Sequence, residues 1–215
     1  MLNSKMLALI AIAAMAMMSL ASGLAAAPAY PGYTGLIFTP TADTLNMGGV
    51  NFGASYLSSD DIDTSYFSAN IGIINGFEVG AALLDPDEGD NDTILNAKYS
   101  VLKETFATPG IAFGVSDLTD EIDVTPYVVV TKTLDIPKLT LHQIKGSIGF
   151  GDGTLDGVFA GLSAVISDNL TLMTEYDTDN LNIGLQFAAA GGFRAHVDLI
   201  DGDDIGFGLN FNKGF

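Results

Sequence analysis

The sequence predicts an all-β fold: a transmembrane antiparallel β-barrel of about 12 strands, within a range of roughly 8 to 12, preceded by a signal peptide. Three observations lead to this prediction. Apolar and polar residues alternate through most of the 215-residue chain. The polar positions of these segments are mostly Gly, Ser, Asn and Thr, and the last segment ends in Phe.

The composition excludes several other classes of protein. Hydrophobic residues make up 48% of the chain, which is too many for a disordered acidic protein. The absence of Cys excludes disulfide scaffolds, thiolate metal sites and cysteine nucleophiles. With 8 Lys and Arg against 26 Asp and Glu, the net charge of -18 repels phosphate backbones, so we expect no nucleic-acid partner.

Residues 1–29 have the pattern of a secretory signal peptide. Lys5 precedes an apolar run, which ends in small residues. Cleavage is expected after Ala29, with Ala25 and Ala26 as open alternatives. An uncleaved anchor is the other interpretation, but the run is short for a spanning helix of about 20 apolar residues.

Residues 30–48 lie between the signal and the first alternating segment. We interpret them as an N-terminal periplasmic segment or plug at the mouth of the barrel, with an exposed linker as the alternative.

Residues 49–215 form the predicted barrel. Its alternating segments are of the length that crosses a bilayer, about 9 to 11 residues, and turn residues separate them. Within these segments the alternating positions lie at 50–56, 67–73, 77–83, 95–101, 111–115, 125–133, 141–150, 158–164, 170–176, 181–187, 193–199 and 205–215. A secreted sandwich would also alternate, but its wet face would carry long charged side chains.

The charges in the connections support hairpin topology, which places alternate loops on opposite sides of a membrane. The odd-numbered connections hold most of the acidic residues and neither Lys nor Arg. The even-numbered connections hold Lys103 and Lys138 beside only Glu104, Asp135 and Asp168. With an even number of strands, both termini share the less acidic side, which we expect to be periplasmic.

The chain ends in a motif formed by Gly208, Phe211 and Phe215. This motif resembles the C-terminal signature of bacterial outer-membrane barrels, which the barrel assembly machinery reads. The resemblance implies location in the bacterial cell outer membrane, with the assembly machinery and membrane lipid as partners. Lipopolysaccharide is a further expected partner, which cations bound at the acidic outer loops would bridge to the barrel.

Charged residues on the small-residue face are expected to line the lumen: Glu78, Lys98, Lys145, Glu175, Arg194, His196 and Asp198. Their balanced signs suit salt bridges that brace the wall, whereas a selective pore usually has an excess of one sign. Inward glycines, among them Gly72, Gly80 and Gly161, would leave space for a narrow water path. Both interpretations stay open.

The sequence predicts no enzyme. Only His142 and His196 could act as bases at neutral pH. Local spacing places no Ser with a supporting acid beside His142, and His196 is expected to be a structural residue of the lumen.

The acidic loops are candidate sites for Ca2+ or Mg2+, because hard cations take oxygen ligands. The candidate ligands are Asp85, Asp87, Asp90, Asp92, Asp201, Asp203 and Asp204. No EF-hand is complete, no cofactor is required, and a solvated acidic rim is the alternative.

Two stretches, Thr34-Gly-Leu-Ile37 and Thr39-Pro-Thr-Ala42, resemble the opening of the YjbH-type family of outer-membrane proteins associated with exopolysaccharide. Gly161-Leu162 and the stretch from Leu170 to Asp177 are similar to a later part of that family. The resemblance implies a barrel with a non-enzymatic accessory or transport role.

Two functions therefore follow from the sequence. The first is a passive channel or accessory export protein for envelope polysaccharide or small solutes. The second is a non-conducting structural or surface-interaction barrel that uses cation-binding outer loops.

Overall fold

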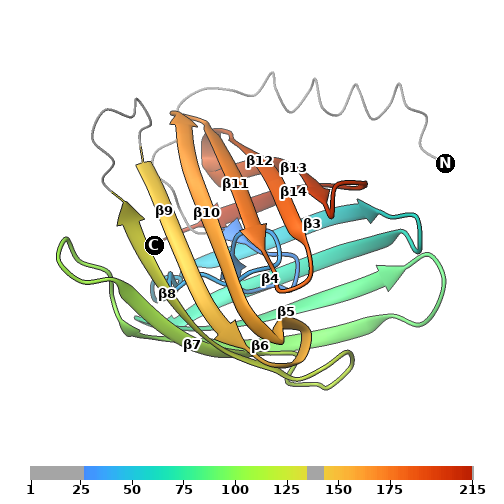
Figure 1. The fold of residues 1–215 in the computed structure, drawn as a ribbon, viewed down its shortest axis with the longest axis horizontal. Coiled ribbons are helices and arrows are strands. Elements are labelled where there is room, and N and C mark those ends of the chain that lie inside the picture. The colour runs from blue at the N-terminus through green and yellow to red at the C-terminus, as the bar shows by residue number, and fades with distance from the viewer. Residues whose placement is uncertain (1–26, 135–142, 215) are drawn as a thin grey trace.

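The computed structural model describes residues 27–134 and 143–214. Twelve antiparallel strands, β3 to β14, close into one barrel, in which β14 pairs with β3 (Figure 1). The prediction of a barrel with about 12 strands is confirmed. Within the described residues, no helix is long and apolar enough to cross a membrane.

The strands of the barrel follow one another as hairpins. Their bounds are β3 Val50–Ser58, β4 Thr64–Ile74, β5 Phe77–Pro86, β6 Asp92–Leu102, β7 Gly110–Ser116, β8 Thr125–Leu134, β9 Gln143–Gly151, β10 Gly157–Ser167, β11 Leu170–Tyr176, β12 Leu181–Ala188, β13 Phe193–Ile200 and β14 Asp204–Lys213. Two short 3-10 helices, η1 Gly153–Leu155 and η2 Ala190–Gly192, lie in connections.

The outer face of the barrel is apolar. Phe52, Phe113, Ile148 and Leu181 are large apolar residues on strands of the wall, and each is about half exposed or more. The residues that alternate with them point inward and are small or polar, as in Gly53 beside Phe52. The wall therefore has the inverted polarity of a membrane barrel, with apolar side chains on the outside.

The two ends of the barrel differ in charge. The connections after β3, β5, β7, β9, β11 and β13 lie at one end, because consecutive strands are antiparallel. These connections carry acidic residues and neither Lys nor Arg. We call this end the acidic mouth, and the opposite end, where Lys103 lies, the second mouth.

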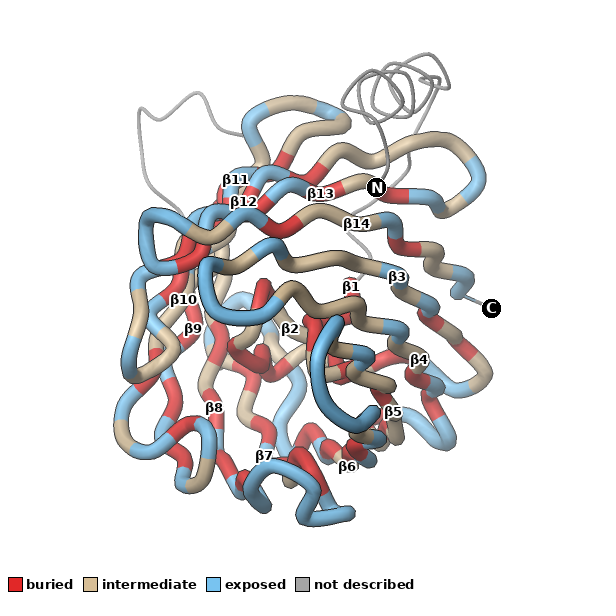
Figure 2. Tube along the Cα trace, turned by 90° about the vertical axis from the view of Figure 1, so that its right-hand side faces the viewer, coloured by how far each residue is buried: buried red, intermediate tan, exposed pale blue. Residues whose placement is uncertain are grey.

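The interior is filled by residues 27–47, which we call the plug. Its two short strands, β1 (Ala27–Pro28) and β2 (Thr34–Gly35), pair only with each other and form a sheet separate from the wall. Figure 2 shows these buried residues inside the ring of strands. Residues 1–26 of the predicted signal lie outside the described residues. Because β1 begins at Ala27, cleavage after Ala26 would leave it intact, and cleavage after Ala29 would remove it.

The inward glycines mark where the plug touches the wall. A Cβ at Gly80 would fall on the carbonyl oxygen of Gly32, and one at Gly72 on that of Asn46. A Cβ at Gly161 would meet the side chain of Leu36. In the described conformation these glycines leave no water path, because plug backbone and side chains occupy the space.

Candidate functional site

The plug is attached to the wall through side chains. Backbone hydrogen bonds join residues 29–41 to one another. Examples are Tyr30 N to Ile37 O at 2.9 Å and Leu36 N to Thr39 O at 2.9 Å. The plug is thus a small folded unit in its own right. Its contacts with the wall concentrate at three inward acidic residues.

The first contact is a buried ion pair. Glu78 of β5 and Lys98 of β6 face each other, with Lys98 Nζ 3.1 Å from Glu78 Oε1. Glu78 accepts hydrogen bonds from Thr34 N at 2.9 Å, Thr34 Oγ1 at 2.7 Å and Leu45 N at 2.9 Å. Lys98 donates to the carbonyl oxygens of Thr34 at 2.6 Å and Thr41 at 3.2 Å. The three donors of an ammonium are thereby used.

The second contact is Glu175 of β11, which binds a turn of the plug. Three successive backbone N–H groups donate to its carboxylate, from Ile37 at 3.0 Å, Phe38 at 2.7 Å and Thr39 at 3.1 Å. The Thr39 hydroxyl donates at 2.7 Å and Asn182 Nδ2 at 3.2 Å. Successive N–H groups form a concave anion site, so the plug binds this carboxylate without a cation.

The third contact is Asp198 of β13. The Tyr30 hydroxyl donates to Asp198 Oδ2 at 3.0 Å, and His196 Nδ1 lies 2.6 Å from the same oxygen. His196 Nε2 lies 3.0 Å from the hydroxyl of Ser55 on β3.

An apolar cluster completes the attachment. Tyr33 of the plug packs with Tyr127, Val129 and Phe159, which point inward from β8 and β10. The rings of Tyr33 and Tyr127 lie 5.7 Å apart. A second apolar cluster joins Tyr30, Leu36 and Ile37 of the plug to Met173 and Ile200 of the wall.

Little space remains beside the plug. Two internal spaces have volumes of about 10 and 70 Å3, which is room for one or a few waters. A cavity of about 1040 Å3 opens at the second mouth, below the plug. It is lined by residues such as Asp43, Lys103, Glu104, Lys132 and Lys145.

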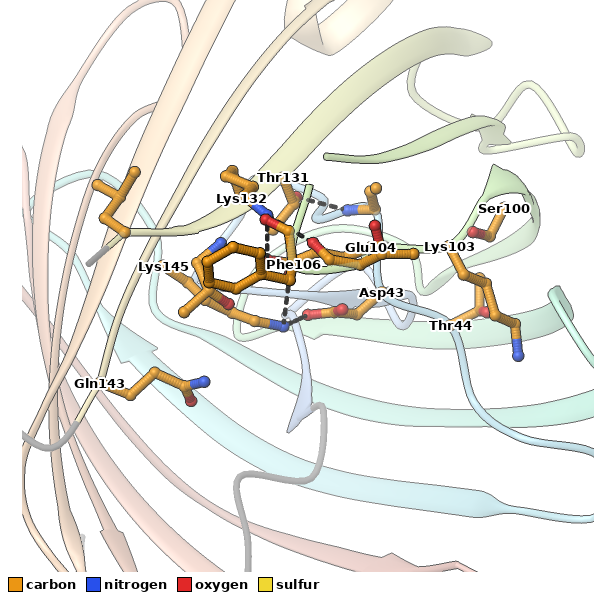
Figure 3. A pocket seen from close by; sticks show the side chains of 15 residues that line it. Asp43, Thr44, Ser100, Lys103, Glu104, Phe106, Thr131, Lys132, Gln143 and Lys145 are labelled. Atoms are coloured by element: carbon orange, nitrogen blue, oxygen red, sulfur yellow. Dashed lines mark hydrogen bonds and ion pairs between the residues drawn. The ribbon is translucent and has the colours of Figure 1, made fainter. Parts of the chain in front are cut away.

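Figure 3 shows that Lys132 and Lys145 point toward Glu104 and Asp43, whereas Lys103 points away from them. Lys145 Nζ lies 2.7 Å from Asp43 Oδ2, and Lys132 Nζ lies 3.5 Å from Glu104 Oε1. Partial burial alone would raise the pKa of Glu104, but the Thr133 N–H and the two ammonium groups hold that pKa below its usual range.

The structure places every predicted lumen residue on the inner side of the wall. Glu78, Lys98, Glu175, Arg194, His196 and Asp198 are buried, and Lys145 lines the cavity at the second mouth. They form separate pairs, two of them between wall residues, and their role in bracing the wall stays a prediction. Glu78 pairs with Lys98 and His196 with Asp198, while Lys145 pairs with Asp43 and Glu104. Their role in conduction stays a prediction.

The candidate cation ligands lie at the acidic mouth. Asp85, Asp92 and Asp204 stand at strand ends, and Asp87, Asp90, Asp201 and Asp203 lie in the connections. In residues 27–134 and 143–214, no group of three or more acidic or His side chains is arranged to hold a metal ion. The described residues thus contain no preformed site for Ca2+ or Mg2+, and binding of these ions stays a prediction.

The C-terminal motif is described in part. Gly208 points inward from β14, and Phe211 lies on the outer face, where its ring is 5.0 Å from that of Phe193. Phe215 and His142 lie outside the described residues.

Sequence reasoning missed Tyr30, Ser55 and Asp43 as partners of the lumen charges. It also missed Phe159, because the period-two pattern assigns it to the polar face of its strand. Only the long-range closure of the barrel and the position of the plug bring these residues to the site.

No family model matches this chain, and no curated protein matches it. Among solved structures, a KdgM porin is similar with a TM-score of 0.53 at 11% sequence identity. The match covers 77% of this chain and 99% of the porin chain. The likeness shows a porin-like barrel fold. The resemblance to the YjbH-type family stays a prediction.

Proposed function

We propose that this chain is an outer-membrane barrel that passes small solutes, and that the plug is its internal gate. The apolar outer face supports a membrane location, and the porin-like fold supports a passive, non-enzymatic channel. The described conformation is the closed one.

One observation carries this proposal. The plug is a separate folded unit, whose sheet does not join the wall and whose main anchors are hydrogen bonds to lumen side chains. Such bonds exchange with water, so the plug can leave without breaking any strand pair of the barrel. The cavity at the second mouth is the expected vestibule.

A second candidate function is a non-conducting structural barrel. It is favoured by the apolar cluster around Tyr33 and Phe159, which gives the plug a packed core against the wall. In that case the plug would be a permanent part of the fold.

Conductance in planar bilayers separates the two functions. Wild-type protein should show rare discrete steps, and Glu175→Gln, which loosens the plug, should raise their frequency at least tenfold. Glu88→Gln changes an exposed loop carboxylate and serves as the matched control, expected to behave as wild type. A folded Glu175→Gln barrel that stays silent would establish the non-conducting alternative.

The partners and finer substrate follow from the same proposal. Membrane lipid and lipopolysaccharide would surround the wall, and the barrel assembly machinery would insert it. A role with envelope polysaccharide rests only on the resemblance to the YjbH-type family. Swelling of liposomes in small sugars and in oligosaccharides would distinguish a small-solute channel from a polysaccharide path.

A further inference from the structure

Three inward side chains near the plug form a hydrogen-bonded chain, of which only Asp198 also anchors the plug. Ser55 Oγ lies 3.0 Å from His196 Nε2, and His196 Nδ1 lies 2.6 Å from Asp198 Oδ2. Nucleophile, base and orienting acid thus follow one another in the order that activates a serine. Ser55 and His196 are 141 positions apart, so only the closed barrel brings them together.

Gly208 makes the contact between Ser55 and His196 possible. It lies on β14, between the two strands, and is the register partner of both Ser55 and His196. A Cβ at this position would fall on Ser55 Oγ and His196 Nε2. The absence of a side chain therefore leaves the space in which the serine and the imidazole meet.

The partners of Asp198 set the proton positions on the imidazole. A carboxylate oxygen only accepts hydrogen bonds, and Asp198 Oδ2 also accepts one from the Tyr30 hydroxyl at 3.0 Å. In the neutral ring, Nδ1 therefore carries the proton and Nε2 is free to accept from Ser55. This is the tautomer that a general base needs.

Two polar atoms of residues on β13 lack a partner among the described residues. They are Asp198 Oδ1 and Nη1 of Arg194, and both residues are buried. Arg194 shares the inner face of β13 with His196 and Asp198.

The plug covers the site. The Tyr30 ring lies edge-on to His196, with centroids 5.6 Å apart, and Tyr30 and Ile37 line the adjoining space of about 10 Å3. No substrate fits while Tyr30 is in place. Displacement of the plug would uncover Ser55 and His196 together.

We propose that Ser55, His196 and Asp198 form a latent nucleophilic site for carboxylic esters, sealed by the plug. Ser55 Oγ bonds to the ester carbonyl carbon as its proton moves to His196 Nε2. The bond to the alcohol then breaks, and the alcohol leaves with that proton. Water attacks the acyl-serine in a second round, which releases the acid and restores the serine.

Diisopropyl fluorophosphate tests this proposal in the refolded full-length mature chain, because a serine activated in this way displaces its fluoride. Tyr30→Gly removes the cover over the imidazole, and Glu175→Gln loosens the other end of the plug. Mass spectrometry should find the adduct on Ser55 at least tenfold faster in either variant than in wild type.

His196→Gln in the Tyr30→Gly background should slow labelling at least about 100-fold, the lower range for a general base. Ser55→Ala should abolish it, and Ser68→Ala, which removes a hydroxyl lining the same space, should leave it unchanged. Hydrolysis of p-nitrophenyl acetate should follow the same order.

Absence of the adduct from Ser55 in folded Tyr30→Gly and folded Glu175→Gln would overturn the proposal, as would labelling that does not depend on His196. Heat-dependent gel mobility identifies a folded barrel. If only one of the two variants is folded, labelling of Ser55 in that variant tests the proposal. The proposal needs displacement of the plug but no conduction, so a labelled yet electrically silent barrel would refute the channel and retain the site.

Discussion

Two buried carboxylates hold the plug, and they are neutralised in different ways. Glu78 is paired with Lys98, and both charges also bind plug backbone. The five donors that the structure gives Glu175 are uncharged, three of them successive N–H groups of residues 37–39. Breaking an ion pair leaves a buried charge, whereas removing the charge of Glu175 leaves unsatisfied plug donors.

This difference has a consequence for movement. When the plug leaves, Glu78 and Lys98 lose their bonds to plug atoms but keep each other's opposite charge, because their 3.1 Å ion pair lies entirely within the wall. Glu175 would lose its plug donors, keep only Asn182 and need water in their place. The Glu175 contact is therefore the more sensitive control point of the plug.

The largest effect is expected from Glu175→Gln. An amide has one acceptor oxygen, and its NH2 group would face plug N–H groups. At about 1 to 3 kcal/mol for each unsatisfied donor, two such donors cost about 2 to 6 kcal/mol. Native-state hydrogen exchange of the amides of residues 37–39 should show protection falling accordingly.

The exposed loop variant Glu88→Gln is the matched control and should leave this protection unchanged. Wild-type protection at residues 37–39 in Glu175→Gln would show that apolar packing around Tyr33, and not the carboxylate, holds the plug.

The next effect is expected from Lys98→Met, which leaves Glu78 buried without its cation. Such a change costs about 3 to 5 kcal/mol. The double variant Glu78→Gln/Lys98→Met should lose less than Lys98→Met alone, because no buried charge remains and the amide both accepts and donates. Urea unfolding followed by circular dichroism measures both. If the double variant loses as much unfolding free energy as Lys98→Met or more, Glu78 and Lys98 do not compensate each other's buried charge.

Much of the wall was predictable from the sequence. Successive side chains along a strand point to opposite faces of the sheet. Phe52 and Gly53 can therefore be assigned to opposite faces from the sequence alone, before their spatial neighbours are known. Hairpin connectivity also orders the loops, and the acidic residues accordingly collect at one mouth.

The interior was less predictable, because its contacts join residues far apart in the sequence. The bond between Ile37 and Glu175 spans 138 positions, and no local pattern marks it. Phe159 breaks the small-residue pattern of the inner face because it packs in the buried cluster that contains Tyr127 and the plug residue Tyr33. The inward glycines were visible as a pattern, but their cause, the close approach of plug backbone, was not.

The smallest effect is expected at Asp117, a carboxylate in the connection after β7 that also binds backbone N–H groups. It accepts hydrogen bonds from the N–H groups of Glu121 at 3.2 Å, Ile122 at 2.7 Å and Asp123 at 3.0 Å, and from the Thr119 hydroxyl at 2.8 Å. Burial alone would raise the pKa of Asp117, but these hydrogen bonds hold it below its usual range.

Because the folded pKa of Asp117 is lowered, its stabilisation of the loop is complete above the unfolded pKa of about 3.9 and is lost as the pH falls through the folded pKa. Hydrogen-exchange protection factors of the loop should therefore fall below about pH 4, and Asp117→Asn should have low protection at every pH. Asp120→Asn, in the same loop, is the control that keeps the wild-type profile. An unchanged pH profile in Asp117→Asn would show that anion binding by successive N–H groups orders the plug turn at Glu175 but not this loop.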